Sequence, residues 1–171
     1  MKNILSLLGT ITLIGTSTTS LVACDNVNEY TPEELTKLKE ENKIDTKNKK
    51  IRDNLEWMAP QEKSFNEVDN KHYYVVWRGD KNENWKIVKF QNKKEQRLIK
   101  FDEQNKYYIK IGQYNGGFDI SINQYPSSIR TLKPWQKDNE AYFKFVYRWN
   151  LDTNVPDLIL DENSNVKVND E

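Results

Sequence analysis

The feature that most constrains the fold is an alternation of apolar and polar residues in the second half of the chain. Phe118, Ile120 and Ile122 alternate with polar residues, and residues 141–149 repeat the pattern with mostly aromatic side chains. A period of two places alternate side chains on opposite faces of a β-strand. Both segments therefore predict strands with one apolar face, and that face of the sheet is expected to lie in a core.

Further strands are expected upstream, where similar runs are separated by short segments of turn-forming residues. The expected strands lie within residues 72–77, 85–90, 98–101 and 107–111, and a last short one at 158–160. The intervening turns are 79–82, 91–94, 102–105 and 115–117. Short turns join neighbouring strands in antiparallel pairs. We therefore predict a mainly β domain over residues 65–162, an antiparallel meander that forms a small barrel or a sandwich.

The region before this domain is expected to be helical, which makes the chain α+β overall. Residues 31–34, Thr-Pro-Glu-Glu, form a capping box and predict a helix to about Lys43. Apolar residues at three- and four-residue spacing predict a second helix from Lys47 to Met58. We expect residues 24–64 to be a tether and a charged helical stalk, and residues 163–171 to be a flexible acidic tail.

The first 24 residues have the layout of a secretory signal. Lys2 is followed by an apolar run over residues 4–14, then by small polar residues, and then by Leu21-Val22-Ala23-Cys24. The apolar run is shorter than the roughly 20 residues that cross a bilayer. We therefore expect residues 1–23 to be a removable signal peptide.

The four residues that end at Cys24 resemble the lipobox of bacterial lipoproteins. In that family the cysteine thiol carries a diacylglyceryl group, and signal peptidase II cleaves just before it. The resemblance implies lipidation of Cys24, with the mature chain anchored at the extracytoplasmic face of the cell membrane. The leader and the abundance of Asn, Lys and Ile are also similar to surface lipoproteins of Mollicutes. The alternative is a soluble secreted protein in which Cys24 is incidental.

The residue inventory argues against an enzyme. His72 is the only histidine and Cys24 the only cysteine, so Cys–His nucleophile pairs and His- or Cys-rich zinc sites are excluded. No glycine-rich phosphate loop is present. We therefore predict no catalytic residue, no metal ligand and no cofactor. The 26 basic and 26 acidic residues balance, which disfavours a nucleic-acid partner.

The tryptophans are the most ambiguous feature. Aromatic rings on a sheet can stack against sugars or other flat ligands, but they also fill small cores. Trp135, Trp77 and Trp85 are the tentative ligand contacts, and Trp135, in the long loop 124–138, is the one expected to be exposed. Residues 78–80, Arg-Gly-Asp, resemble the integrin-recognition motif, although Gly-Asp is also ordinary turn chemistry.

These features favour a non-enzymatic binding or interaction protein that acts on a soluble ligand or a host surface. The first alternative is a structural or antigenic surface component without a dedicated ligand. A carboxylate-dependent hydrolase is less favoured, and it would need two acids that converge in a cleft. A concave, aromatic-lined pocket would favour binding, whereas a filled core without a patch would favour the structural alternative.

Overall fold

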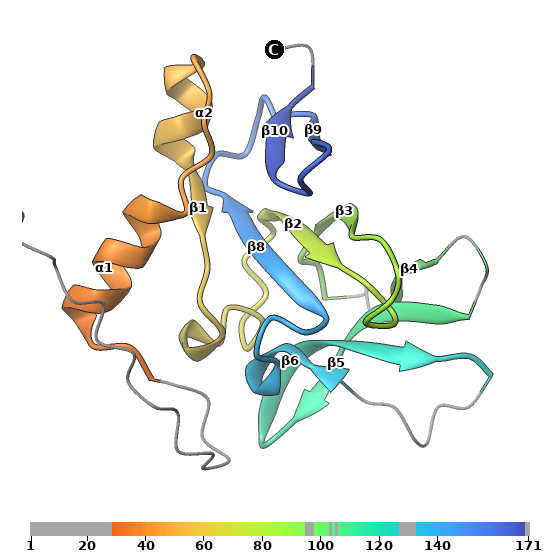
Figure 1. The fold of residues 1–171 in the computed structure, drawn as a ribbon. Coiled ribbons are helices and arrows are strands. Elements are labelled where there is room, and N and C mark those ends of the chain that lie inside the picture. The colour runs from red at the N-terminus through yellow and green to blue at the C-terminus, as the bar shows by residue number, and fades with distance from the viewer. Residues whose placement is uncertain (1–28, 95–97, 103, 105, 127–132, 170–171) are drawn as a thin grey trace, which may run out of the picture.

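The computed structural model describes residues 29–94, 98–102, 104, 106–126 and 133–169 (Figure 1). The whole predicted leader, with Cys24, lies outside these residues. The elements in chain order are α1 (Pro32–Glu41), α2 (Lys49–Asn54), β1 (Leu55–Trp57), the 3₁₀ turn η1 (Pro60–Glu62), β2 (His72–Trp77), β3 (Lys86–Gln91), β4 (Leu98–Phe101), β5 (Tyr107–Tyr114), β6 (Gly117–Gln124), β7 (Lys133–Pro134), the 3₁₀ turn η2 (Trp135–Lys137), β8 (Phe143–Trp149), β9 (Leu158–Leu160) and β10 (Val166–Val168).

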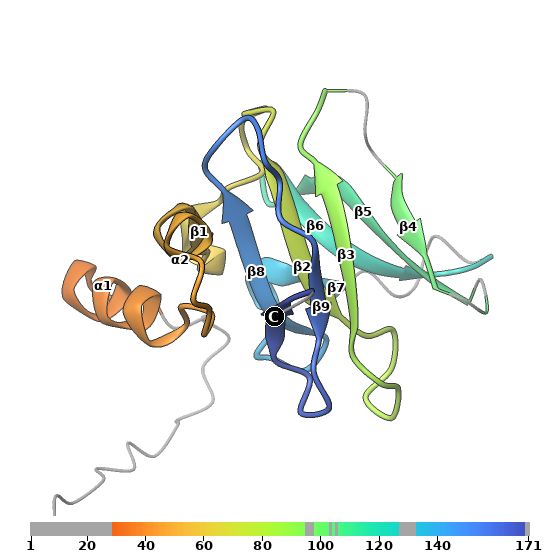
Figure 2. The ribbon, with the colours of Figure 1, turned by 90° about the horizontal axis from the view of Figure 1, so that it is seen from above.

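The strands form two four-stranded antiparallel sheets and a two-stranded ribbon. The first sheet has the order β1-β8-β2-β3, the second has the order β4-β5-β6-β7, and β9 pairs with β10. Figure 2 shows the two sheets as neighbouring layers. The predicted mainly β, antiparallel fold is confirmed. Of the two predicted arrangements the sandwich is found, because the strands of the described ranges do not close into one barrel.

The main core lies between the two sheets. Tyr73, Val75 and Trp77 point into it from β2, and Ile109 and Ile120 meet them from β5 and β6. Aromatic rings fill one side of this core. The Phe65 ring centroid lies 4.9 Å from that of Tyr73, and Tyr73 lies 5.8 Å from Phe90. The alternation seen in the sequence is therefore the alternation of core-facing positions.

The first sheet is buried on its other face as well. Tyr74, Val76 and Trp149 pack there in a second cluster with residues of α2, β9 and β10. Because β2 has apolar neighbours on both faces, its sequence is a nearly continuous apolar run instead of a strict alternation.

Helix α1 begins with the predicted capping box. The Thr31 hydroxyl accepts a hydrogen bond from the Glu34 backbone N–H, and the Glu34 carboxylate accepts one from the Thr31 backbone N–H. The helix ends at Glu41, close to the predicted end, and it buries no residue. Polar contacts link it to the domain, among them the ion pairs of Lys39 with Glu56 and Glu62.

The prediction that the second helix reaches Met58 is wrong. Helix α2 ends at Asn54, and Leu55–Trp57 form strand β1, which pairs with β8. The pairing supplies backbone hydrogen bonds and buries Leu55, while Asp53 and Asn54 favour a helix only weakly. The segment that was expected to be a stalk thus supplies an edge strand.

Two further expectations need correction. Val166–Val168 pair with β9 as strand β10, so this part of residues 163–171 is not a flexible tail. The stretch 124–138, expected to be an irregular surface loop, contains strand β7 and the turn η2. Both segments are ordered by apolar side chains, Val166 and Trp135, that enter the two cores.

Candidate functional site

The structure does not bring the three candidate tryptophans together. Trp77 and Trp135 lie in the core between the sheets, with 1% and 5% of their surface exposed. Trp85 packs against the cluster on the opposite face of the first sheet, and the Arg78 guanidinium lies 4.3 Å from its ring centroid. The expectation that Trp135 is exposed is therefore wrong. Cys24 lies outside the described residues, so its role stays a prediction.

A buried carboxylate explains the position of Trp135. Asp119 accepts a hydrogen bond from the Gln136 backbone N–H at 2.9 Å and another from the Trp135 N–H, and so caps the turn η2. This turn directs the Trp135 ring into the core, where its centroid lies 6.0 Å from that of Phe65. Burial raises the pKa of Asp119 to about 7, although the backbone hydrogen bonds act in the opposite direction.

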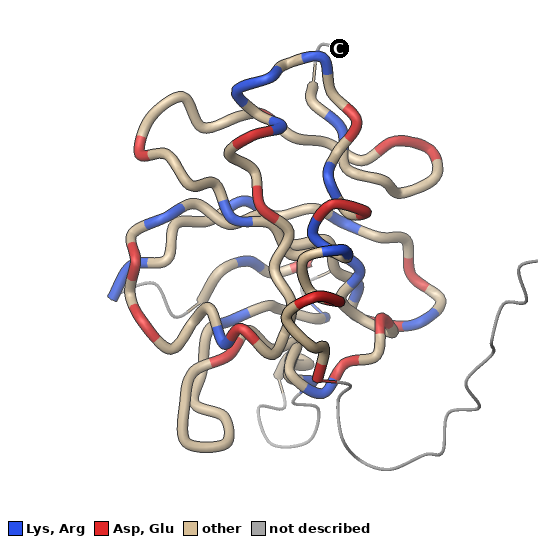
Figure 3. The backbone as a smooth tube through the Cα atoms, turned by 90° about the vertical axis from the view of Figure 1, so that its left-hand side faces the viewer, with Lys and Arg blue, Asp and Glu red and all other residues tan. Residues whose placement is uncertain are grey.

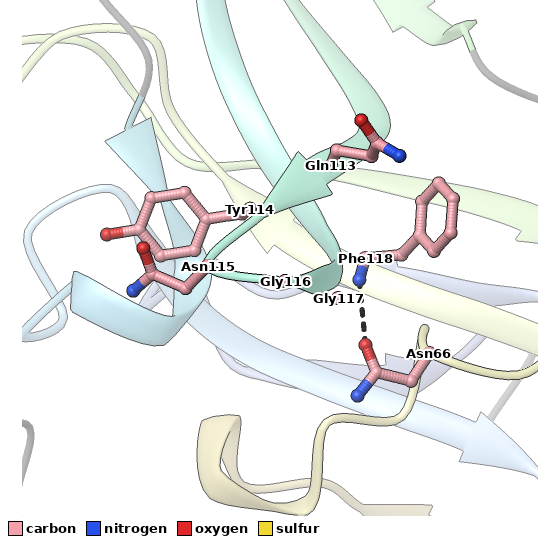
Figure 4. A pocket seen from close by; sticks show the side chains of 7 residues that line it. All are labelled: Asn66, Gln113, Tyr114, Asn115, Gly116, Gly117 and Phe118. Atoms are coloured by element: carbon pink, nitrogen blue, oxygen red, sulfur yellow. Dashed lines mark hydrogen bonds between the residues drawn. The ribbon is translucent and has the colours of Figure 1, made fainter.

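A hollow on the surface lies at the end of the β5–β6 hairpin (Figure 4). Its volume is about 560 Å³, which lies within the range of ligand sites. Its lining combines side-chain amides, aromatic rings and the glycines of the turn: Asn66, Gln113, Tyr114, Asn115, Gly116, Gly117 and Phe118. We call it the hairpin hollow. None of the described residues that line it is charged.

The turn that forms the hairpin hollow has the backbone that its sequence dictates. Asn115 and Gly116 both have positive φ, 46° and 80°, as a two-residue type I′ hairpin turn requires. Gly117 then lies so close to Asn66 that a Cβ atom there would be 2.3 Å from Asn66 Oδ1. That oxygen accepts a hydrogen bond of 2.7 Å from the Phe118 N–H. The dashed line in Figure 4 marks this contact between the hairpin and the segment after η1.

Much of the hydrogen-bonding capacity at the hairpin hollow is unused. In the described part of the chain, the Gln113 and Asn115 side-chain amides and the Tyr114 hydroxyl make no hydrogen bond, and Asn66 uses only its oxygen. Phe118 is opposite Gln113 in the β5–β6 register, on the face that carries the core residues Ile111 and Ile120. The lining therefore offers amide donors and acceptors beside an aromatic ring.

A second hollow, of about 450 Å³, lies where the end of α1 meets β8 and the β9–β10 ribbon. Its lining includes the aromatic side chains of Phe145 and Tyr147 and the acids Glu41, Asp45 and Asp161. Hydrogen bonds from backbone N–H groups, that of Asn165 foremost, lower the pKa of Asp161. This carboxylate is therefore engaged in its own turn, and the hollow has a mixed, charged rim.

The outer side of the second sheet has a small aromatic cluster. The Phe101 ring centroid lies 5.2 Å from that of Tyr108 and 5.8 Å from that of Tyr125. Tyr125 is 56% exposed and Leu98 is 51% exposed. The second sheet therefore has exposed apolar surface on this side.

Charged residues are mixed over the surface. Figure 3 shows basic and acidic residues interspersed along the described chain. The guanidinium of Arg78 donates hydrogen bonds of 2.8 Å to the carbonyl oxygens of Ala141 and Lys81, in addition to its contact with Trp85. His72, at the start of β2, is half-buried, and burial together with Lys89 and Lys93 lowers its pKa. The Arg78 guanidinium is therefore paired with groups of its own chain, and the surroundings of His72 disfavour its charged form.

Comparisons with family models, with curated proteins and with solved structures give no match for this chain. Within the described ranges, no helix is long and apolar enough to cross a membrane. The function must therefore be argued from the residues of the chain itself.

Sequence reasoning missed most of the hairpin hollow. The Asn115-Gly116 pair predicted the turn. The alternation through Phe118 predicted which side chains of β6 face the core. Nothing in the sequence linked Asn66 to Phe118, which lies 52 residues further along the chain. This contact depends on how the segment after β1 crosses the end of the second sheet.

Proposed function

We propose that this chain is a membrane-anchored surface lipoprotein whose β-sandwich is a non-enzymatic binding module on the outer membrane face. The Leu-Val-Ala-Cys sequence that ends at Cys24 supports the anchor. The hairpin hollow is the observation that carries the binding function, because it is concave and offers unpaired amides beside aromatic rings.

The arrangement of the chain suits an anchored module. The chain advances by five residues from Cys24 to Glu29, the first described residue, and can span at most about 18 Å over that stretch. An anchor at Cys24 therefore holds the α1 end of the molecule near the bilayer. Helix α1 and strand β4 lie on opposite sides of the molecule in both Figure 1 and Figure 2. The second sheet would thus face away from the membrane, toward soluble ligands or a host surface.

The alternative is a structural or antigenic component without a dedicated ligand. The filled core favours this alternative, because Trp77, Trp135 and Trp149 are buried and their rings cannot contact a ligand. The hairpin hollow favours binding, because a structural surface gains nothing from unpaired amides gathered in a concavity of ligand size.

Lipid labelling and surface proteolysis test the anchored location. Cells that express the full chain are labelled with radioactive palmitate, then treated with protease while intact. We expect labelled protein that is degraded from outside, and a Cys24→Ser variant that is not labelled. Ser17→Ala, within the leader but outside the lipobox, is the matched control and should be labelled normally. Equal labelling of the Cys24→Ser variant would contradict the proposal.

A ligand screen tests the binding function. The purified lipoprotein is titrated with a panel of peptides, oligosaccharides and host-cell surface extracts of known composition. We expect at least one saturable ligand whose binding is weakened by Tyr114→Ala. The structural alternative predicts that no member of the panel binds saturably, and that result would overturn the binding function.

A further inference from the structure

We infer that the hairpin hollow binds a neutral, hydroxyl-rich ligand, that is, an uncharged saccharide. This inference rests on the proposed binding function and names its ligand class. It goes beyond that function because it assigns the recognition to Gln113, Phe118 and Asn66, none of which the sequence analysis proposed as a ligand contact.

The uncharged lining of the hairpin hollow favours an uncharged ligand. No described residue of the hairpin hollow carries a charge, whereas the second hollow is lined by Glu41, Asp45, Asp161, Lys43 and Lys167. A phosphorylated, sulfated or strongly cationic ligand would lose hydration in the hairpin hollow without gaining a counter-charge. A neutral polar ligand loses less and can recover its hydrogen bonds.

The polar groups of the lining are of the kind that pairs with hydroxyl groups. Each side-chain amide has two N–H donors and a carbonyl acceptor, and a hydroxyl can pair with both kinds. Gln113 and Asn115 have this full capacity free in the described structure, and Asn66 keeps its Nδ2 donors. Adjacent hydroxyl groups on a sugar ring present donors and acceptors side by side, which is the pattern that such amides satisfy.

The aromatic lining matches the apolar face of a sugar. Phe118 is half-buried and packs against the main core, while part of its ring lines the hairpin hollow. Gln113 lies opposite Phe118 in the β5–β6 register, so its amide is on the same face as this ring, whereas Tyr114 points to the other side of the hairpin (Figure 4). A pyranose ring exposes C–H groups on one face, and these pack on an aromatic face while the hydroxyl edge reaches the amides.

The hairpin hollow is also fixed in shape before a ligand arrives. The type I′ turn at Asn115 and Gly116 sets the end of the hairpin, and the Asn66–Phe118 hydrogen bond holds it against the first half of the domain. A rigid site loses little conformational freedom on binding. In a shallow sugar site each contact contributes little to the binding free energy. Such a site therefore binds only if little conformational entropy is lost.

The test is a titration of the mature lipoprotein in a detergent without a sugar headgroup. The probes are neutral oligosaccharides with terminal glucose, galactose or N-acetylglucosamine, each compared with its sialylated or sulfated counterpart. We expect saturable binding of at least one neutral probe and at least tenfold weaker binding of its charged counterpart.

Three variants locate the binding. Gln113→Ala removes a free amide and should weaken the neutral probe roughly fivefold to tenfold. Phe118→Leu keeps an apolar contact with the core but removes the ring, and should weaken binding at least tenfold. Tyr125→Ala, which removes an exposed ring outside the hairpin hollow, is the control and should leave the affinity unchanged.

The inference fails if no neutral probe binds at about 10 mM, or if both hollow variants bind as tightly as the unaltered chain. If a peptide or an anionic ligand instead binds saturably and depends on Tyr114, the binding function stands while the saccharide assignment is overturned. If no member of either panel binds, both are overturned.

Discussion

The ammonium group of Lys39 lies 2.5 Å from Glu56 Oε1, and this contact joins helix α1 to the edge strand of the first sheet. The same nitrogen lies 2.6 Å from Glu62 Oε1, and Arg148 Nη2 lies 2.8 Å from the second Glu56 oxygen. The side chains of Lys39 and Glu56 are each 25% exposed, so water screens this network only in part. Because α1 buries no residue, polar contacts hold the helix on the domain: this network, and the hydrogen bond that the Tyr147 hydroxyl donates to the Asn42 carbonyl oxygen at the helix end.

A Lys39→Met variant should release α1 from the domain. The change keeps the length of the side chain but leaves Glu56 and Glu62 with less positive charge nearby, at an expected cost of about 1–2 kcal/mol in unfolding free energy. Hydrogen exchange should accelerate in α1 and stay slow in β2. Lys37→Met, which removes only the exposed pair with Glu41, is the control. Unchanged exchange in α1 of the Lys39 variant would show that other contacts hold the helix.

Asp119 should make the domain less stable as the pH rises toward neutrality. Burial raises its pKa from 3.8 to about 7 in the folded chain. The folded state thus binds the proton more tightly than the unfolded chain, so this contribution to stability is complete below about pH 4 and is lost as the pH rises to about 7. Over this window the loss is on the order of 2–4 kcal/mol.

Urea unfolding at several pH values measures this contribution. The Asp119→Asn variant should have a flatter pH profile than the unaltered chain between pH 4 and pH 7, because asparagine does not titrate there. The exposed Asp45→Asn change is the control and should preserve the profile. A profile for Asp119→Asn that is parallel to that of the unaltered chain would contradict the assignment.

We expect that the Arg-Gly-Asp segment needs glycine at position 79 because a larger side chain would clash with the core. On this account the glycine has a packing role and not a role in recognition by a partner. A Cβ atom at Gly79 would lie 2.2 Å from the Tyr107 ring and 2.7 Å from Tyr107 Cβ, which cannot move freely in the core. We expect Gly79→Ala to destabilise the domain by about 2–4 kcal/mol. Gly112→Ala is the control, since its nearest neighbour would be 3.7 Å away. Thermal unfolding distinguishes the two, and equal midpoints would contradict the packing role.

Strands could be predicted from the sequence where one face of the strand lies in the core and the other does not. The alternation at Phe118, Ile120 and Ile122 identified β6 because its two faces meet different surroundings. The Asn115-Gly116 turn and the Thr31 capping box could also be predicted, because both depend only on neighbouring residues in the chain. These parts of the fold need no information from distant residues.

The parts that sequence reasoning missed depend on distant partners. Ile51, Leu55 and Met58 fit a helical spacing, but pairing of Leu55 with Trp149 draws the segment into the first sheet. Trp135 is buried because Asp119, 16 positions earlier in the chain, caps the turn that carries it. Neither partner could be identified from local pattern.

Mass analysis of the native amino terminus is the most direct test of the central claim. Cells that express the full chain are fractionated, the protein is isolated and digested, and its amino-terminal peptide is identified. The account predicts a peptide that begins at Cys24 and carries a diacylglyceryl group on the sulfur. An amino terminus without lipid, or recovery of the protein from the cytosol, would contradict it.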